Sequence, residues 1–182
     1  MKAESFNIQG PLLIEPKVFE DERGYFFESY SKQQFVQIGV NEEFLQSNQS
    51  LSHKGVLRGL HFQLPPYAQS KLVRVISGSV LDVVVDIRVG SPTYGKHVSA
   101  ILSGNNKKMF YVPVGFAHGF LTLEDNTVFS YKCGNYYNKA AEQGIMWNDP
   151  DLKIDWDILQ PVISEKDQAN QSFRDFMSPF NL

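Results

Sequence analysis

Short runs of β-forming residues, separated by turn residues, recur along most of the chain and limit its fold more than any other feature. The clearest runs are Lys71–Ile76, Val80–Arg88 and Thr127–Cys133, which are rich in valine, isoleucine or aromatic residues. Further strands are expected at 12–19, 25–30, 44–51, 56–63, 97–102, 108–112 and 119–123. Short strands at this spacing are typical of an antiparallel β-sandwich or barrel.

Local signals add turns and two helical segments to this pattern. Ser77-Gly78-Ser79 lies between two strand runs and predicts a β-hairpin. Ser31 as N-cap, Gln34 in a capping box and Gly39 as the stop predict one short helix. The tail from Ser164 also has a helical pattern.

The run Val80–Arg88 has two distinct faces. Because side chains alternate along a strand, one face carries Leu81, Val83, Val85 and Ile87. The other face mixes apolar and charged side chains, namely Val80, Asp82, Val84, Asp86 and Arg88.

Length and composition favour one domain over residues 1–182, with enough apolar residues for an ordinary core. A net charge of −3 provides no electrostatic footprint for nucleic acid. No apolar run is long enough for a membrane span, and the first residues lack a signal-peptide pattern. Cys133 is the only cysteine, so an intrachain disulfide is impossible and a reducing compartment is favoured. These features predict a cytoplasmic protein.

Two short motifs resemble those of cupin barrels. Gly55, His61 and Gln63 have the spacing of the first cupin motif, and Pro113–His118 resembles the second. A metal-binding cupin would need a second histidine where Gln63 stands, and a glutamate nearby. A neutral amide is a poor ligand, and His61 with His118 falls short of the three protein ligands usual in a catalytic metal site. We therefore expect neither a metal nor any other cofactor.

A longer ordered set of motifs extends from about Glu15 to Asp167: FEDERGYFFESY, QSNQS, VLRGLHFQ, KLVRV, VPVGFAHGFLTL, YKCGNYY, GIMWNDP and SEKD. Together they resemble the dTDP-4-dehydrorhamnose 3,5-epimerase family. Ser47 departs from the pattern, since an acid often stands at that position. The resemblance implies a mainly β, cupin-like antiparallel β-barrel (a jelly roll) with a few short helices. It also implies a homodimer that exchanges N-terminal strands.

The resemblance implies a substrate, dTDP-4-keto-6-deoxyglucose, whose C4 ketone acidifies the protons on C3 and C5. Inversion at each carbon requires a base, an acid on the opposite face and a stabiliser for the enolate. By resemblance, His61 is the base, Lys71 the stabiliser and Tyr131 the proton donor. An imidazole with a pKa near ~6.5 is free to accept a proton at neutral pH, and a phenol near ~10 retains its own.

Asp167 has two interpretations. The resemblance pairs it with His61, where it would orient the ring and stabilise the imidazolium. The local sequence Ser164-x-x-Asp167 is equally a helix N-terminal capping pattern.

The remaining family positions concern substrate binding, and they are Arg23, Glu28, Gln46, Asn48, Arg58, His118, Tyr137, Glu142 and Lys166. Among them, arginines suit a diphosphate because their planar fork makes paired hydrogen bonds. Tyr137 would stack on thymine. Phe26 and Gln63 are expected to line the pocket. Each of these residues, taken alone, could instead be a solvated charge or a packed side chain.

Two other functions remain open from the sequence. One is a related 4-ketosugar epimerase that acts at C3 or C5 alone, because such relatives can share the base and the acid. The other is a non-catalytic cupin that binds a sugar nucleotide. A ketoisomerase would usually carry a second histidine where Gln63 stands.

Overall fold

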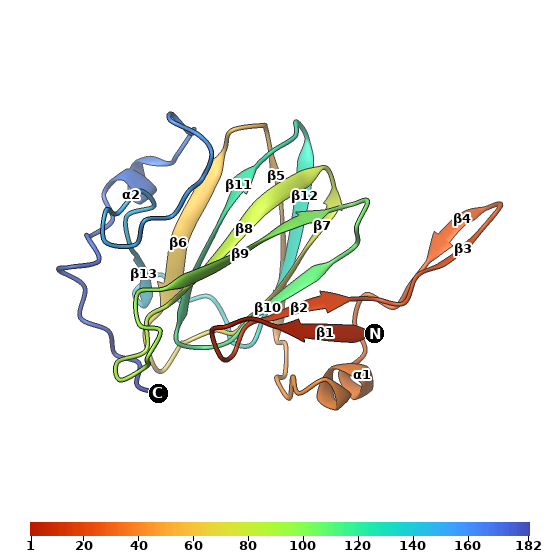
Figure 1. The fold of residues 1–182 in the computed structure, drawn as a ribbon, viewed down its shortest axis with the longest axis horizontal. Helices are drawn as coiled ribbons and strands as arrows, with labels where there is room; N and C mark the ends of the chain where they lie inside the picture. Colours follow the sequence, from red (N-terminus) through yellow and green to blue (C-terminus); the bar gives the residue numbers. More distant parts are fainter.

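The computed structural model describes all 182 residues and consists mainly of two antiparallel sheets that face each other (Figure 1). The first sheet has the order β1 (Lys2–Ser5), β2 (Leu12–Glu15), β10 (Met109–Val112), β7 (Lys71–Ser77), β12 (Thr127–Cys133) and β5 (Gln46–Ser52). The second has the order β13 (Glu142–Gly144), β6 (Leu57–Gln63), β11 (Phe116–Thr122), β8 (Ser79–Asp86) and β9 (His97–Ser103). The prediction of a mainly β, antiparallel fold is confirmed.

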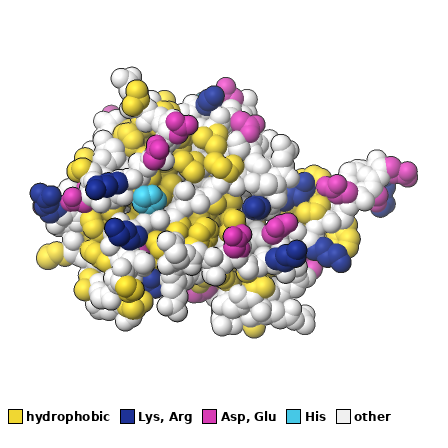
Figure 2. Space-filling view, in the orientation of Figure 1, with side chains coloured by type: hydrophobic (Ala, Val, Ile, Leu, Met, Phe, Trp, Pro, Cys, Tyr) yellow, Lys and Arg dark blue, Asp and Glu magenta, His cyan; other side chains and the backbone are white.

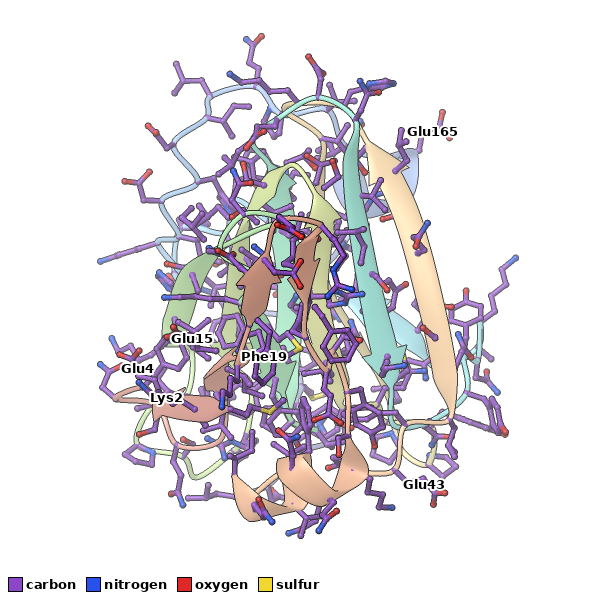
Figure 3. All side chains as sticks on the ribbon, turned by 90° about the vertical axis from the view of Figure 1, so that its right-hand side faces the viewer. Lys2, Glu4, Glu15, Phe19, Glu43 and Glu165 are labelled. Atoms are coloured by element: carbon purple, nitrogen blue, oxygen red, sulfur yellow. The ribbon has the colours of Figure 1, made fainter.

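Four small elements lie outside these sheets. β3 (Phe19–Asp21) and β4 (Gly24–Phe26) pair only with each other and form an arm that projects from the body of the molecule (Figure 1). Figure 2 shows acidic side chains along this arm, and in Figure 3 the arm, with Phe19 labelled, stands in front of the sheets. The helices are α1 (Lys32–Gln37) and α2 (Glu165–Gln168), and neither has the length or apolar content needed to cross a membrane.

The core has two layers, one on each face of β8. Val80 and Val84 point between the sheets and pack with a cluster that includes Phe110 and Phe129. Val83, Val85 and Ile87 point outward and pack against the C-terminal segment through Leu152, Trp156, Phe176 and Phe180. Both faces of β8 are therefore buried, and its charged residues need partners inside the protein.

The charged residue Asp86, at the end of β8, has such partners. Its carboxylate accepts hydrogen bonds from Arg88 Nε at 2.9 Å, Ser91 Oγ at 2.6 Å and Thr93 Oγ1 at 2.7 Å. Burial alone would raise the pKa of Asp86, but these donors outweigh it and lower the pKa to about 2. Asp86 is therefore an ionised carboxylate that binds the residues of the loop after β8.

The predicted hairpin at Ser77-Gly78-Ser79 is wrong. β7 pairs with β10 and β12, whereas β8 pairs with β11 and β9, so this turn carries the chain from one sheet to the other. Gly78 has a φ of +81°, and a Cβ there would lie 2.2 Å from Thr127 Oγ1. The turn residues were recognised correctly, but a local pattern does not say which strands pair.

The helix predictions are partly right. α1 begins after Ser31 and ends before Gly39, whose φ is +90°, as expected. The capping box is wrong, because Ser31 makes no side-chain cap bond and the Gln34 amide donates to the Glu28 carboxylate instead. The helical tail is limited to the four residues of α2. Beyond it, the chain packs along the second sheet as irregular segments.

A pair of glycines brings β6 and β11 unusually close. Gly59 has a φ of +149°, and a Cβ built on it would lie 2.6 Å from the Gly119 Cα. The register shifts at this point, and beside it His61 and His118 stand directly opposite each other. The close approach therefore determines how two histidines meet at the mouth of the barrel.

We predict that Gly59→Ala destabilises the protein by more than about 1 kcal/mol, because the new methyl group meets backbone and the φ is unfavourable for alanine. Gly90→Ala is the matched control, since Gly90 also has a positive φ, +84°, but no atom within 4 Å of an added Cβ. Urea unfolding of both variants measures the difference. Equal losses would show that the contact with Gly119 is unimportant.

Candidate active site

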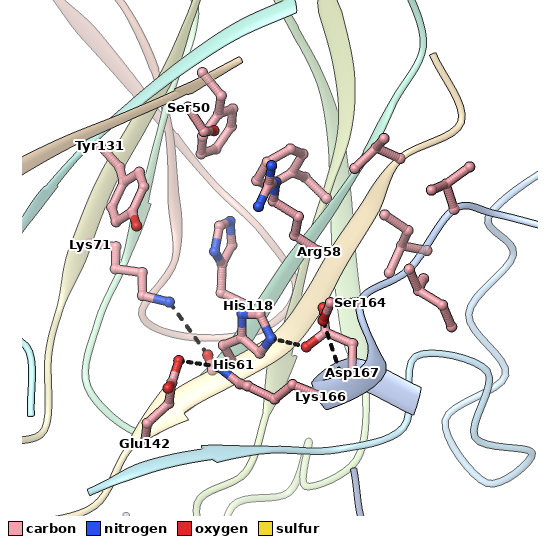
Figure 4. Close-up of a pocket in the computed structure, with 16 residues that line it drawn as sticks. Ser50, Arg58, His61, Lys71, His118, Tyr131, Glu142, Ser164, Lys166 and Asp167 are labelled. Carbon is pink, nitrogen blue, oxygen red and sulfur yellow. Dashed lines mark hydrogen bonds and ion pairs between the residues drawn. The ribbon is translucent and has the colours of Figure 1, made fainter. Parts of the chain in front are cut away.

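A cavity of about 490 Å³ opens between the two sheets at the mouth of the barrel (Figure 4). Among the side chains that line it are His61, Lys71, His118, Tyr131, Glu142 and Asp167. A smaller cavity of about 280 Å³ shares His61, Lys71, Tyr131 and Glu142, and adds Gln46, Asn48, Gln63 and Tyr137. The two cavities together form one elongated site that contains most of the residues predicted from the sequence.

Strand register explains how these side chains converge. On the first sheet, Tyr131 pairs with Asn48, while Lys71 pairs with Cys133 two positions along β12. Residues two apart on a strand share a face, so Tyr131 and Lys71 project from the same side. His61 comes from β6 of the facing sheet. The cavity thus receives the imidazole from one sheet and the phenol and amine from the other.

His61 and Asp167 form a hydrogen-bonded pair. The distance between His61 Nε2 and Asp167 Oδ1 is 2.5 Å, with side-chain exposures of 25% and 4%. Asp167 lies in α2, where its backbone N–H donates to Ser164 Oγ at 3.1 Å. The two interpretations of Asp167 are therefore both correct: its backbone is capped by Ser164 and its side chain pairs with His61.

The pKa of Asp167 is held below its usual value. Burial acts in the opposite direction, but the hydrogen bond and charge of His61, with smaller contributions from the Gly59 backbone and Ser164, outweigh it. An ionised Asp167 accepts the Nε2 proton, which leaves the lone pair of a neutral His61 ring on Nδ1. His61 can therefore act as a base at Nδ1.

Lys71 and Tyr131 lie in a poorly solvated part of the cavity. Lys71 Nζ is 3.4 Å from the His61 carbonyl oxygen, and burial lowers the pKa of the amine, while the charges of Asp82 and Glu142 act to raise it. Burial is also the main cause of the raised pKa of Tyr131, so its hydroxyl keeps its proton at neutral pH. The cavity therefore contains an imidazole with a free Nδ1, a phenol that keeps its proton and a buried amine.

A chain of polar contacts covers the outer end of the site. Tyr137 Oη donates to Glu142 Oε2 at 2.9 Å, and Lys166 forms an ion pair with the same carboxylate. Gln46 Nε2 donates to Asn48 Oδ1 at 3.0 Å, and Gln46 Oε1 accepts from the Tyr137 backbone N–H at 3.0 Å. These residues are mutually linked and remain accessible to a ligand at the rim.

Arg58 and Gln63 differ in how free they are to bind a ligand. Arg58 is exposed and lines the larger cavity, with Nε and Nη2 each 3.3 Å from Ser52 Oγ. The Gln63 amide, in contrast, donates to the backbone carbonyls of Tyr67 and Tyr136 and accepts from the Asn138 N–H. Gln63 lines the smaller cavity, but its polar atoms hold the neighbouring loops.

Three predicted binding residues lie outside this cavity. Arg23 and Phe26 belong to the arm and line a separate surface hollow there, where Arg23 pairs with Asp21. Glu28 follows the arm and accepts a hydrogen bond from Gln34. The structure of one chain therefore does not bring Arg23, Phe26 or Glu28 to His61.

The sequence analysis assigned no place in the site to Ser50 or Asp82, two polar residues in or beside the cavity. Ser50 faces the cavity with a buried hydroxyl that has no hydrogen-bond partner. Asp82, fully buried on β8, accepts a hydrogen bond from His118 Nε2 at 2.9 and 3.0 Å to its two oxygens. The signal for Asp82 was its place on the same strand face as Val80 and Val84, which indicates a buried carboxylate.

The donor set offers no metal centre. No group of three or more histidine, cysteine, aspartate or glutamate side chains is arranged to hold a metal ion. Each cavity histidine instead has a carboxylate as the partner of its Nε2.

Comparisons with known proteins agree on one family. The family model for dTDP-4-dehydrorhamnose 3,5-epimerase matches residues 5–175. The Shigella flexneri dTDP-4-dehydrorhamnose 3,5-epimerase is 52% identical over 165 residues, covering 90% of this chain and 91% of the relative.

Solved structures show the same fold. The dTDP-4-dehydrorhamnose 3,5-epimerase from Elizabethkingia anophelis superposes with a TM-score of 0.91 at 50% identity, covering 96% of this chain and 97% of the other. The dTDP-6-deoxy-D-glucose-3,5-epimerase from Legionella pneumophila, in complex with dTDP-4-keto-L-rhamnose, gives 0.93 at 45% identity, with coverages of 97% and 94%. The predicted cupin-like barrel is confirmed.

We predict that Ser164→Ala and Asp167→Asn differ in how their effects on stability depend on pH. Because the pKa of Asp167 is lowered by folding, its ionised side chain stabilises the protein above the unfolded pKa and loses this effect as the pH falls below about 4. The deficit of Asp167→Asn, on the order of 1–3 kcal/mol at pH 7, should shrink in that range.

The deficit of Ser164→Ala, about 1 kcal/mol from the lost cap, should change much less with pH, since the hydroxyl is uncharged and makes only a small contribution to the lowered pKa of Asp167. Urea unfolding between pH 7 and pH 3 measures both deficits. A deficit of Asp167→Asn that stays constant across this range would contradict the ionised pair.

Proposed function

The chain belongs to the dTDP-4-dehydrorhamnose 3,5-epimerase family, an isomerase family, and we propose that it converts dTDP-4-dehydro-6-deoxy-D-glucose into dTDP-4-dehydro-L-rhamnose. The reaction inverts C3 and C5 and is a step of dTDP-L-rhamnose biosynthesis. The observation that carries the proposal is one cavity in which His61, paired with Asp167, faces Tyr131 and Lys71 from the opposite sheet.

His61 is the proposed base. Its Nδ1 is free, and Asp167 stabilises the imidazolium formed when a proton is taken from C3 or C5. If the substrate proton is less acidic than imidazolium by on the order of ten pKa units, the gap costs ~14 kcal/mol, at ~1.36 kcal/mol each. Histidine alone cannot supply this. The enolate must therefore be stabilised by charge fixed in the site.

Lys71 is the proposed source of that charge, and Tyr131 is the proposed acid. Both groups lie in surroundings where burial lowers the local dielectric, so a positive charge acts strongly on a nearby enolate oxygen. Tyr131 projects from the sheet that faces His61, which suits proton delivery to the other side of the sugar ring. Proton removal and return on opposite faces produce inversion.

The rim residues are proposed to bind the nucleotide part of the substrate. Arg58 and Lys166 supply cations for the diphosphate, and Tyr137 supplies an exposed ring for thymine. Polar side chains between rim and cavity would hold the sugar and phosphates, namely Gln46, Asn48, His118 and Glu142, with Gln63 beside them. We propose no nucleic-acid or membrane partner, and a cytoplasmic location that suits the free thiol of Cys133.

The arm residues are proposed to act in the site of a partner subunit. The arm leaves the body, and Phe19, Tyr25 and Phe26 on it are more than half exposed, at 53%, 56% and 67%. Such exposure of aromatic side chains suits burial against a second copy of the chain. In a homodimer with exchanged arms, Arg23, Phe26 and Glu28 would complete the neighbour's pocket.

Two alternative functions have different signatures. An epimerase for one carbon would use the same base and acid, so deuterium uptake at C3 alone or C5 alone would identify it. A cupin that only binds sugar nucleotides would take up no deuterium. Proton NMR of dTDP-4-keto-6-deoxyglucose with the enzyme in deuterated water separates all three, and our proposal requires exchange and inversion at both carbons.

We predict that His61→Ala and Tyr131→Phe fail differently in that assay. His61→Ala should lose both exchange and epimerisation by at least ~10²-fold, the ordinary contribution of a positioned base. In Tyr131→Phe the enolate still forms but is reprotonated mainly by His61 on the original face. Residual deuterium uptake with much less inverted product is therefore expected. Normal inversion by Tyr131→Phe would show that another group is the acid.

We predict full activity without added metal, because Gln63 and the lack of a third ligand leave no metal centre. The pure enzyme is assayed before and after dialysis against a chelator. Activity that disappears after dialysis and returns with a divalent ion would contradict the prediction.

We predict that light scattering gives twice the 20.7 kDa chain mass, and that Arg23→Ala and His61→Ala complement each other. Each variant alone is nearly inactive, but a mixed dimer with exchanged arms has one site with both native residues. After random subunit exchange, about a quarter of wild-type activity is expected. A mixture of His61→Ala with Tyr131→Phe is the control, since both residues belong to one chain's cavity. No recovery in the first mixture would place Arg23 outside the partner's site.

A further inference from the structure

A second histidine–aspartate pair, whose histidine lines the cavity, takes no part in the proposed proton transfers. His118 on β11 stands opposite His61, and its Nε2 lies 2.9 and 3.0 Å from the two oxygens of Asp82. The pair is more enclosed than that of His61, with side-chain exposures of 7% for His118 and 0% for Asp82. In Figure 4 the His118 ring points into the space between Tyr131 and Arg58.

The pairing of β8 with β11 brings Asp82 and His118 together. Asp82 pairs with Phe120 and Val84 pairs with His118, so Asp82 and His118 are diagonal neighbours on adjacent strands. Asp82 shares the inward face of β8 with Val80 and Val84. Its carboxylate has no hydrogen-bond donor other than the His118 ring, so the two side chains constrain each other.

Nδ1 is the nitrogen of His118 that remains for a ligand. It makes no hydrogen bond within the chain, while the ring lines the cavity. We infer that Asp82 is a positioning residue: it holds the Nε2 proton of His118, so that Nδ1 faces the cavity as a hydrogen-bond acceptor for a substrate hydroxyl. This inference rests on the proposed epimerisation and goes beyond it by assigning a role to Asp82.

Charge balance supports a neutral His118 ring. Burial lowers the pKa of His118, although the adjacent Asp82 acts to raise it; Lys71, and His61 when it is protonated, lower it further, and Arg58 is another cationic side chain that faces this part of the cavity. Burial raises the pKa of Asp82 and lowers the pKa of Lys71, while each group favours the charged form of the other, so a proton on His118 would add a further buried charge to this enclosed cluster. The ring is therefore neutral, and Asp82 decides which nitrogen carries its single proton.

A neutral acceptor at this position suits the proposed reaction. A hydroxyl of the sugar that donates to Nδ1 would be held beside His61, which fixes the carbon presented to the base. A cationic His118 would instead repel the imidazolium that forms on His61. The sugar is thus oriented by a residue that does not disturb the basicity of its neighbour.

The test combines kinetics with a direct measurement of the ring. In the wild-type enzyme at neutral pH, ¹⁵N NMR of His118 should show a protonated Nε2 and an unprotonated Nδ1. Asp82→Asn should shift this tautomer, because its amide can donate to Nε2, and should reduce kcat/KM by at least about tenfold. In an enzyme that already carries His118→Asn, adding Asp82→Asn should reduce kcat/KM no further.

Asp86→Asn is the matched control. Asp86 is equally buried on the same strand, but its partners are Arg88, Ser91 and Thr93, outside the cavity. We expect this variant to lose stability, while the His118 spectrum and the kinetics of the folded enzyme remain those of wild type. If Asp82→Asn does not fold, Asp82→Glu, which displaces the carboxylate by a methylene group, provides the same comparison.

Three outcomes would overturn the inference: an unprotonated Nε2 in wild type, a kcat/KM of Asp82→Asn within about twofold of wild type, or losses that add fully in the double variant. The tautomer measurement needs no turnover. A wild-type enzyme that leaves dTDP-4-keto-6-deoxyglucose unchanged would therefore refute the proposed function, while the ring spectrum still reports on Asp82.

Discussion

The hydrogen bond between His61 and Asp167 joins two parts of the molecule that are far apart in the chain. His61 belongs to the barrel, whereas Asp167 belongs to the irregular C-terminal segment. That segment is held against the outer face of the second sheet by Trp156, Phe176 and Phe180. Burial of these aromatic side chains, each contributing roughly 1.5–3 kcal/mol, positions Asp167 with the precision that a 2.5 Å contact requires. The geometry of the proposed base therefore depends on packing that lies outside the barrel.

Ionisable side chains inside the barrel occur in pairs, each histidine with an aspartate. His61 with Asp167 and His118 with Asp82 have the same chemistry but different exposure, and exposure determines what each can do. The more open His61 is accessible from the cavity, as its proposed role as the base requires. The enclosed His118 is confined to one protonation state by desolvation, which suits the orientation of a substrate. Lys71 on the facing sheet lines the same cavity, and the charge of Asp82 acts to raise its pKa against the effect of burial.

The inner wall of the cavity belongs to the hydrophobic core, whereas its rim does not. Phe120 and Phe129 stack with ring centroids 4.0 Å apart and line the inner wall of the cavity. They belong to the cluster between the sheets, so the floor of the site is the rigid core itself. The rim, in contrast, consists of polar side chains bonded to one another, and the arm leaves the body altogether. The site therefore changes from a closely packed apolar inner wall to an exposed polar rim.

Much of this molecule was predictable from the sequence, because strands, turns and motifs are local. Alternation along Val80–Arg88, the glycine at the end of α1 and the motifs around His61, Lys71 and Tyr131 needed no coordinates. Only the tertiary structure decided that the turn at Gly78 joins two sheets, and that Asp82 meets His118. It also showed that Asp167 can be capped by Ser164 through its backbone and still reach His61 with its carboxylate, so the two interpretations left open by the sequence hold together. Register and sheet pairing depend on contacts between distant segments, and no local pattern contains them.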